Sequence, residues 1–215
     1  MSISPEDLQG YLRIVAEATR NEVVTTVSGE RAHPLLPKTE EELFRFWNAG
    51  GSALAILNGE VVGHATIEPL SEGWYEIGAV WVRKDLRGGQ GGTHHHVGYR
   101  LYKALLERHH DKFLITTTIT PAIIVLGLRV GMVPVRYENL PREAWQATCV
   151  CPVEKTGVER YENVPSCKIK NTGCIVLVSQ EAWRHIGQPE PHTTPVQPQG
   201  DAQIPQDDIE FFFPE

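Results

Sequence analysis

Five residues, Gly-Gly-Gln-Gly-Gly, stand directly before a helical pattern in this chain. The segment Asp85–Arg108 reads DLRGGQGGTHHHVGYRLYKALLER, and its second half places Val97, Leu101 and Leu105 on one helical face. A flexible loop that opens a helix gathers unpaired backbone N–H groups at the positive end of the helix dipole, which suits phosphate or pyrophosphate. The sequence therefore predicts an anion-binding loop at Gly88–Thr93, with an unliganded glycine-rich turn as the alternative.

Two familiar phosphate-binding motifs do not fit the spacing of this loop. A P-loop requires Lys and then Ser or Thr after its last glycine, whereas Gly92 is followed by Thr93 and His94. A dinucleotide fingerprint that began at Gly89 would need glycine at position 94. Another kind of anion site and an unliganded turn are therefore the interpretations that remain.

The histidine triplet His94, His95 and His96 follows the glycines directly. Adjacent residues on a helix point about 100° apart, so three in a row cannot share one metal ion without distortion. We expect no metal site there, and one imidazole facing the phosphates as an additional donor.

The chain has four cysteines, all in a short segment near the C-terminal end. Cys149, Cys151, Cys167 and Cys174 could bind zinc tetrahedrally and stabilise a loop that has little core of its own. Their spacing lacks the Cys-x-x-Cys pair of a zinc ribbon, and the reducing cytosol disfavours disulfides. A zinc site and free thiols, with Cys174 in a strand, both remain open.

The composition is that of an ordinary globular protein. Of 215 residues, 41% are hydrophobic and 22% charged, and no apolar run approaches the ~20 residues of a membrane span. The N-terminus has no apolar signal core, so we expect a cytoplasmic protein without a membrane partner. Much of the net charge of −7 comes from residues 188–215, which leaves the rest near neutral and predicts no nucleic-acid partner.

The elements that must position the loop alternate between helices and strands. Ser4 and Pro5 begin a helix that runs to Arg20, and Thr39 with Glu42 forms a capping box for a second helix. The pair Asn58-Gly59 predicts a hairpin. Further strands are expected at 74–82, 113–119, 132–138 and 174–179, and a further helix at 121–130. This order predicts an α/β layered fold.

The chain divides into three parts by composition. Residues 1–146 form the expected core, and residues 147–187 hold the cysteines and a final strand. Residues 188–215 are rich in proline, glutamine and acidic residues, which predicts a disordered tail. The tail closes with DDIEFFFPE, either a sticky end or a docking peptide for its own domain or a partner.

The loop and its flanks resemble the GCN5-related N-acetyltransferase (GNAT) superfamily, whose acyl-CoA-binding signature is V-x-x-x-x-R-G-x-G-x-G. Val82, Arg87 and Gly88 match it, and Gln90 stands at the central glycine. LNGEVVGHATI resembles the family's second and third strands, and TPAIIVLGLRVGMVPV a later helix and strand. The resemblance covers residues 5–140 and implies a GNAT fold: a mixed, mostly antiparallel sheet flanked by helices, here with a cysteine-containing insertion.

The resemblance implies an acetyl-CoA-dependent N-acetyltransferase that acts on the amine of a small molecule. Backbone groups of one splayed strand would hold the pantetheine arm and the acetyl carbonyl, and the loop would wrap the pyrophosphate. The residues at these positions are Val80, Trp81, Val82, Arg87, Gly88, Gly89, Gln90, Gly91, Gly92 and Thr93.

The family's general base is frequently a glutamate earlier on the same strand, which corresponds to Glu76. Strict alternation places Glu76, Gly78, Val80 and Val82 on one face, so Glu76 could reach the cleft; an exposed edge carboxylate is the alternative. His64 is a second catalytic candidate and fits a packed, hydrogen-bonded histidine as well. Glu68, on the same preceding strand, is a further candidate.

The family's general acid, a tyrosine in the later helix, has no counterpart here. Gly127 stands at that position, and Thr120 at that of a family asparagine. The alternative function is therefore a CoA-binding module with weak or no catalysis, used for sensing or assembly.

The segment NLPREAWQATCVCP resembles short acetyltransferases similar to N-acetylglutamate synthase, which favours an amino acid acceptor. An α-carboxylate would then need a cation, for which Arg31 and Arg136 are candidates. A homodimer is a candidate assembly.

Overall fold

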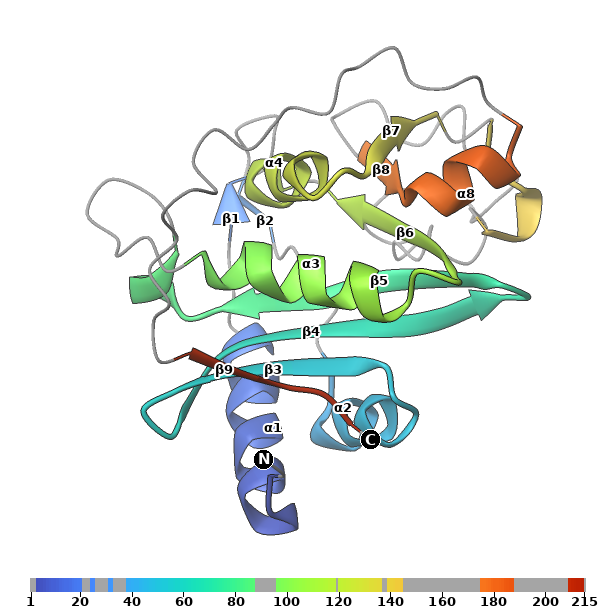
Figure 1. The fold of residues 1–215 in the computed structure, drawn as a ribbon. Helices are drawn as coiled ribbons and strands as arrows, with labels where there is room; N and C mark the ends of the chain where they lie inside the picture. The colour runs from blue at the N-terminus through green and yellow to red at the C-terminus, as the bar shows by residue number, and fades with distance from the viewer. Residues whose placement is uncertain are drawn as a thin grey trace.

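The computed structural model describes residues 3–20, 24–25, 31–32, 38–87, 96–118, 120–136, 139–144, 175–187 and 209–214 (Figure 1). The predicted anion loop, Gly88–Thr93, lies outside these residues, as do His94 and His95. The four cysteines also lie outside them, so neither the zinc nor the thiol interpretation is tested.

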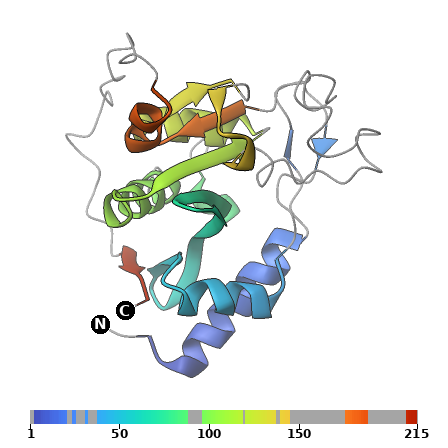
Figure 2. The ribbon, with the colours of Figure 1, turned by 90° about the vertical axis from the view of Figure 1, so that its right-hand side faces the viewer.

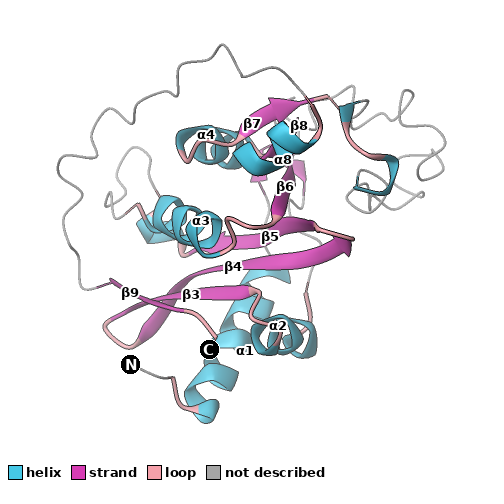
Figure 3. Cartoon of the chain, turned by 45° about the vertical axis from the view of Figure 1, so that its right-hand side comes forward, coloured by secondary structure: helices cyan, strands magenta, loops and turns pink. Residues whose placement is uncertain are grey.

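A seven-stranded sheet forms the centre of the fold (Figure 3). Its strands lie in the order β7-β8-β6-β5-β4-β3-β9, with β5 and β6 parallel and the other neighbours antiparallel. This confirms the expected α/β fold with a mixed, mostly antiparallel sheet. The strands are β3 Ser52–Leu57, β4 Glu60–Ser71, β5 Trp74–Val82, β6 Phe113–Thr118, β7 Val133–Val135, β8 Ile175–Val178 and β9 Ile209–Phe212. Two short strands, β1 Val24–Thr25 and β2 Arg31–Ala32, pair separately.

Helices lie on both sides of the sheet, with α3 on one side and α1 and α2 on the other (Figure 2). The helices are α1 Pro5–Arg20, α2 Glu40–Asn48, α3 Val97–Arg108, α4 Pro121–Arg129 and α8 Gln180–His185, with a 3₁₀ turn η1 Lys84–Leu86. No helix among the described residues is long and apolar enough to span a membrane.

Local sequence signals account for several of these boundaries. The Thr39 hydroxyl accepts from the Glu42 N–H at 3.2 Å, and the Glu42 carboxylate accepts from the Thr39 N–H at 2.8 Å, which confirms the capping box. Asn58 and Gly59 both adopt positive φ, 52° and 78°, as the two-residue turn between β3 and β4 requires.

Apolar residues form one cluster on the α3 face of the sheet and two on the opposite face. Leu101, Tyr102 and Leu105 of α3 belong to the first. On the opposite face, one cluster joins α1 and α2 to Trp81, and another surrounds Trp74 beside α8. The stretch of sheet between these two clusters carries polar residues, which form the candidate site.

Three segments differ from the sequence-based expectation. The helix after the glycine loop begins at Val97, so His96 is its N-cap, with φ 50°, and not part of its first turn. Helix α8 was not predicted. Within the expected disordered tail, Ile209–Phe212 form β9 along β3, because its apolar side chains contribute to the cores on both faces of the sheet.

Candidate active site

Strands β5 and β6 pair only at their beginnings. The parallel register runs from Trp74 opposite Phe113 to Glu76 opposite Ile115, although β5 continues to Val82. Over the described residues, the backbone of β5 beyond Glu76 has no ladder partner on β6. Such an opening supplies free N–H and C=O groups, which are the groups that an extended amide-containing chain can bind.

A chain of hydroxyl groups closes the gap at the point where the two strands part. The Thr116 hydroxyl donates to the Ile77 carbonyl at 3.1 Å and lies 3.0 Å from the Tyr102 hydroxyl. Because Thr116 has only one hydroxyl hydrogen, Tyr102 must donate to it. Burial raises the pKa of Tyr102. Tyr102 therefore stays neutral and fixes the opening from the α3 side.

A β-bulge at Ala79 changes which side chains of β5 share a face. Ala79 has φ 45°, and the register moves from Thr66 opposite Gly78 to His64 opposite Trp81. Strict alternation had placed Val80 and Val82 with Glu76 and Gly78, and this expectation is wrong. Beyond the bulge, Val80 and Val82 pack in the α3-face cluster, and Trp81 joins the opposite cluster.

His64 is fully buried beside this bulge. Its Nδ1 lies 3.3 Å from the Ala79 carbonyl, and because a carbonyl can only accept, Nδ1 carries the hydrogen. Desolvation lowers the pKa of His64 to about 4, against a smaller rise from this hydrogen bond. The imidazole is thus neutral and supports the bulge, an arrangement that favours the packed interpretation over a catalytic base.

Glu76 and Glu68 face each other across β5 and β4. The two residues are register partners on the face opposite α3. Desolvation, followed by the charge of Glu68, raises the pKa of Glu76 to about 8, while Lys38 and a backbone hydrogen bond from Thr117 oppose the rise. A carboxylate with this pKa can hold or release a proton near neutral pH.

Glu68 is held from two directions. Its Oε2 accepts from Lys38 Nζ at 2.7 Å, and its Oε1 accepts from the Thr66 hydroxyl at 3.2 Å. Gly78 lies against the same carboxylate, since a Cβ there would stand 3.3 Å from Glu68 Oε1. The Thr117 hydroxyl on the neighbouring strand is buried without a hydrogen-bond partner in this structure.

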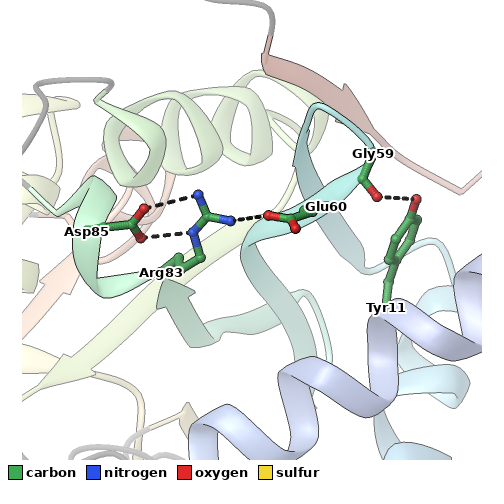
Figure 4. Close-up of polar contacts among 5 residues, drawn as sticks. All are labelled: Tyr11, Gly59, Glu60, Arg83 and Asp85. Atoms are coloured by element: carbon green, nitrogen blue, oxygen red, sulfur yellow. Dashed lines mark hydrogen bonds and ion pairs between the residues drawn. The ribbon is translucent and has the colours of Figure 1, made fainter.

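Side-chain hydrogen bonds and ion pairs hold the end of β5 just before the predicted anion loop (Figure 4). The guanidinium of Arg83 binds both carboxylate oxygens of Asp85, at 2.8 and 3.0 Å, and Glu60 at 2.7 Å (Figure 4). On the far side of the β3–β4 turn, the Tyr11 hydroxyl donates to the Gly59 carbonyl at 3.1 Å. Arg87 Nε donates to the Val82 carbonyl at 2.6 Å. The segment that leads into the loop is thus held at Arg83 and Arg87.

Helix α3 begins close to the sheet because β4 carries a glycine there. A Cβ on Gly63 would lie 2.7 Å from Val97 Cγ1 and 2.9 Å from Leu101 Cδ1. The first N–H groups of a helix have no acceptor within the helix and carry its positive dipole end, and none of the first-turn residues of α3 is acidic. The described flanks therefore fit a pyrophosphate at this place.

Gly127 lies where the resemblance puts a tyrosine. A Cβ there would collide with Leu177 Cδ1 of β8, so a side chain at this position would require Leu177 or α4 to shift. The absence of a tyrosine is thus part of the packing of α4 against β8.

The structure brings some of the predicted residues together and separates others. Glu76 and Glu68 share one polar cluster, whereas His64 belongs to the bulge. Sequence reasoning missed Lys38 and Tyr102 as residues of this region. Lys38 stands before the N-cap of α2, a position that carries no functional signal in the sequence. The only signal of Tyr102 is a phenol on an apolar helical face.

Comparisons with known proteins agree with this architecture. Residues 20–119 match the acetyltransferase (GNAT) family. Rv2747 from Mycobacterium tuberculosis, in complex with CoA and NLQ, superposes with a TM-score of 0.53 at 16% identity, covering 80% of this chain and 94% of that one. Residues 20–119 thus match the GNAT family, and the fold of the chain is similar to that of a solved GNAT-like structure.

Two further solved structures are similar at lower scores. N-acetylglutamate synthase from Neisseria gonorrhoeae, complexed with coenzyme A and N-acetyl-glutamate, has a TM-score of 0.46 and 14% identity, covering 83% of this chain and 33% of its own. Ribosomal-protein-alanine N-acetyltransferase from Brucella melitensis has a TM-score of 0.45 and 22% identity, covering 63% and 85%. Comparison with curated proteins gives no match.

Proposed function

We propose that this protein transfers the acetyl group of acetyl-CoA to the amine of a small molecule, with an amino acid as the favoured acceptor. The observation that carries the proposal is the opening between β5 and β6 directly beside Glu76. It is supported by the GNAT match and by the complexes of Rv2747 and N-acetylglutamate synthase with CoA.

Named groups of this chain bind the cofactor and accept the proton in the proposed reaction. Backbone groups of Val80, Trp81 and Val82 bind the pantetheine arm, and residues Arg87 to Thr93 with the start of α3 bind the pyrophosphate. Acetyl-CoA supplies the activated thioester. Glu76 takes a proton from the acceptor ammonium, so that the amine can attack the acetyl carbonyl directly.

Calorimetric titration with acetyl-CoA tests the cofactor site. Gly91→Asp adds a negative charge to the predicted anion loop, and we expect it to weaken binding by at least about tenfold. Gly10→Asp is the control, because Gly10 is an exposed position of α1 with nothing near its Cβ. Equal binding by both variants and the wild type would contradict the proposed loop.

A CoA-binding module without efficient catalysis is a second candidate, favoured by Gly127. Because glycine has no side chain, the residue at this position cannot protonate the leaving thiolate. Thiol release from acetyl-CoA in the presence of amino acids and polyamines separates the two functions. Tight binding without turnover over any acceptor would favour the module.

A further inference from the structure

An ion pair lies beside Glu76, and neither of its two groups takes or gives the proton in the transfer proposed above. Lys38 Nζ and Glu68 Oε2 are 2.7 Å apart, and their side chains are only 18% and 19% exposed. A mostly buried ion pair often costs as much in desolvation as it gains in attraction, so it is a poor device for stability alone. The pair needs a different explanation.

The position of the pair relates it to the acceptor. Glu68 is the register partner of Glu76, the last residue of β5 that pairs with β6. Directly opposite residues in an antiparallel pair have Cβ atoms about 5 Å apart. A group bound at Glu68 therefore lies beside the proposed base and at the edge of the opening.

The charges at this position match those of one class of ligand. The ammonium and carboxylate of an α-amino acid are carried on the same carbon, so they lie side by side, as the Lys38 and Glu68 charges do. We propose that the Lys38–Glu68 pair opens to bind an α-amino acid, Lys38 taking its carboxylate and Glu68 its ammonium. This inference rests on the proposed acetyltransferase function and narrows its acceptor.

The contacts of Glu68 are suited to such an exchange. When Lys38 turns to a ligand carboxylate, the Thr66 hydroxyl still holds Glu68 Oε1, so the carboxylate keeps its place. Each contact between opposite charges that is broken in the pair is replaced by one to the ligand, so the free energy of the exchange is close to zero. The ligand ammonium then faces Glu76, which removes one proton. The neutral amine attacks the acetyl carbonyl, the C–S bond breaks as the amide C–N bond forms, and the second proton lost by the nitrogen leaves with the sulfur as the free thiol.

The two arginines that the sequence offered as cations for an acceptor carboxylate are less suitable than Lys38. Arg136 is exposed and directly follows β7, an edge strand that three other strands separate from β4. The side chain of Arg31 lies outside the described residues. Lys38 is the cation among the described residues whose charge acts on Glu76.

Acceptor kinetics test this inference with matched ligands. Thiol release is measured with the proteinogenic L-amino acids, their α-amides and the corresponding decarboxylated amines. For wild type, we expect kcat/KM for the best amino acid to exceed that for its amide by at least about tenfold. Lys38→Met should abolish this preference by lowering the amino-acid value more than the amide and amine values, because the accompanying change in the pKa of Glu76 acts on all three ligand classes alike. Arg45→Met, which removes an exposed cation of α2, the helix that follows Lys38, should leave the preference unchanged.

The outcomes separate this inference from the proposed function. Turnover of amines and amides as fast as amino acids would keep the acetyltransferase and overturn the role of Lys38. An equal loss for all three ligand classes in Lys38→Met, with a lower Tm, would show a purely structural pair. Calorimetric binding of the same ligands in the presence of CoA gives a second readout that needs no turnover. The proposed role of the Lys38–Glu68 pair would also be overturned if wild type bound no amino acid, or if Lys38→Met bound it as tightly as wild type does.

Discussion

At the scale of single residues, the protonation of Glu76 governs the proposed chemistry. Because burial and Glu68 raise the pKa of Glu76 to about 8, most of this carboxyl is protonated at pH 7 and cannot accept a proton. We therefore expect kcat/KM to rise with pH and to level off above about pH 8. A profile that stayed flat between pH 6 and pH 9 would exclude Glu76 as the base.

Substitution of Glu76 by Gln should remove the base and keep the shape of the side chain. We expect Glu76→Gln to lower kcat by a factor of ~10²–10⁴, the usual contribution of a general base, with unchanged affinity for acetyl-CoA by calorimetry. His64→Gln is an informative comparison, because a residue that supports the bulge should affect Tm at least as much as turnover. Full activity of Glu76→Gln would contradict the assignment.

The same carboxyl should make stability depend on pH. Its pKa is raised in the folded protein, so the stability that its protonated form contributes is complete below about pH 4.5 and is lost as the pH rises through about 8. Glu76→Gln cannot ionise. We therefore expect the Tm of Glu76→Gln relative to wild type to be higher at pH 9 than at pH 5. Scanning calorimetry at the two pH values measures this, and an equal difference at both would show that Glu76 ionises normally.

At the scale of elements, the sequence predicted those helix and turn boundaries that are determined by interactions between neighbouring residues. The capping box at Thr39, the turn at Asn58-Gly59 and the proline at the start of α4 follow from rules that involve a few adjacent residues. The bulge at Ala79 escaped prediction because alanine gives no sign of positive φ. It arises from the pairing of β5 with β4 and the bond to His64.

The candidate site was predictable to a similar extent. The family resemblance predicted a candidate glutamate on the strand that is β5 in the structure, where Glu76 lies. The partnership of Glu68 with Lys38 could not, because it depends on how the segment before α2 lies across the sheet. Contacts between residues 30 positions apart leave no periodic signal in the sequence.

Two helical glycines should respond to alanine in opposite directions. A Cβ at Gly127 would collide with Leu177, so Gly127→Ala should destabilise the protein by about 1–3 kcal/mol. Gly10 in α1 has nothing within 4 Å of an added Cβ, and Gly10→Ala should stabilise by about 0.5–1 kcal/mol. Denaturant unfolding of both variants measures the difference. A neutral Gly127→Ala would mean that α4 can move away from β8 at little cost.

At the scale of the whole molecule, the C-terminal strand joins the two faces of the sheet. On the α3 face, Arg100 lies over the Phe211 ring at 4.4 Å and Arg108 over the Phe213 ring at 5.3 Å, while Arg108 also donates to the Pro214 carbonyl at 2.6 Å. On the opposite face, Phe212 packs into the cluster of α1 and α2. Strand β9 also covers the edge of β3, which would otherwise present unpaired backbone groups.

Removal of this strand should therefore weaken the entire fold. We expect truncation after Asp208 to lower Tm markedly and to promote self-association through the exposed edge of β3, as measured by calorimetry and light scattering. Phe211→Ala should cost about 1–3 kcal/mol through lost burial and the lost contact with Arg100, whereas Glu210→Ala, at an exposed position of the same strand, should cost little. If the truncated protein melts like the full chain, β9 is an accessory to a core that is already complete. A large loss in Phe211→Ala but not in Glu210→Ala would instead make residues 209–214 as much a part of the domain as the strands at its centre.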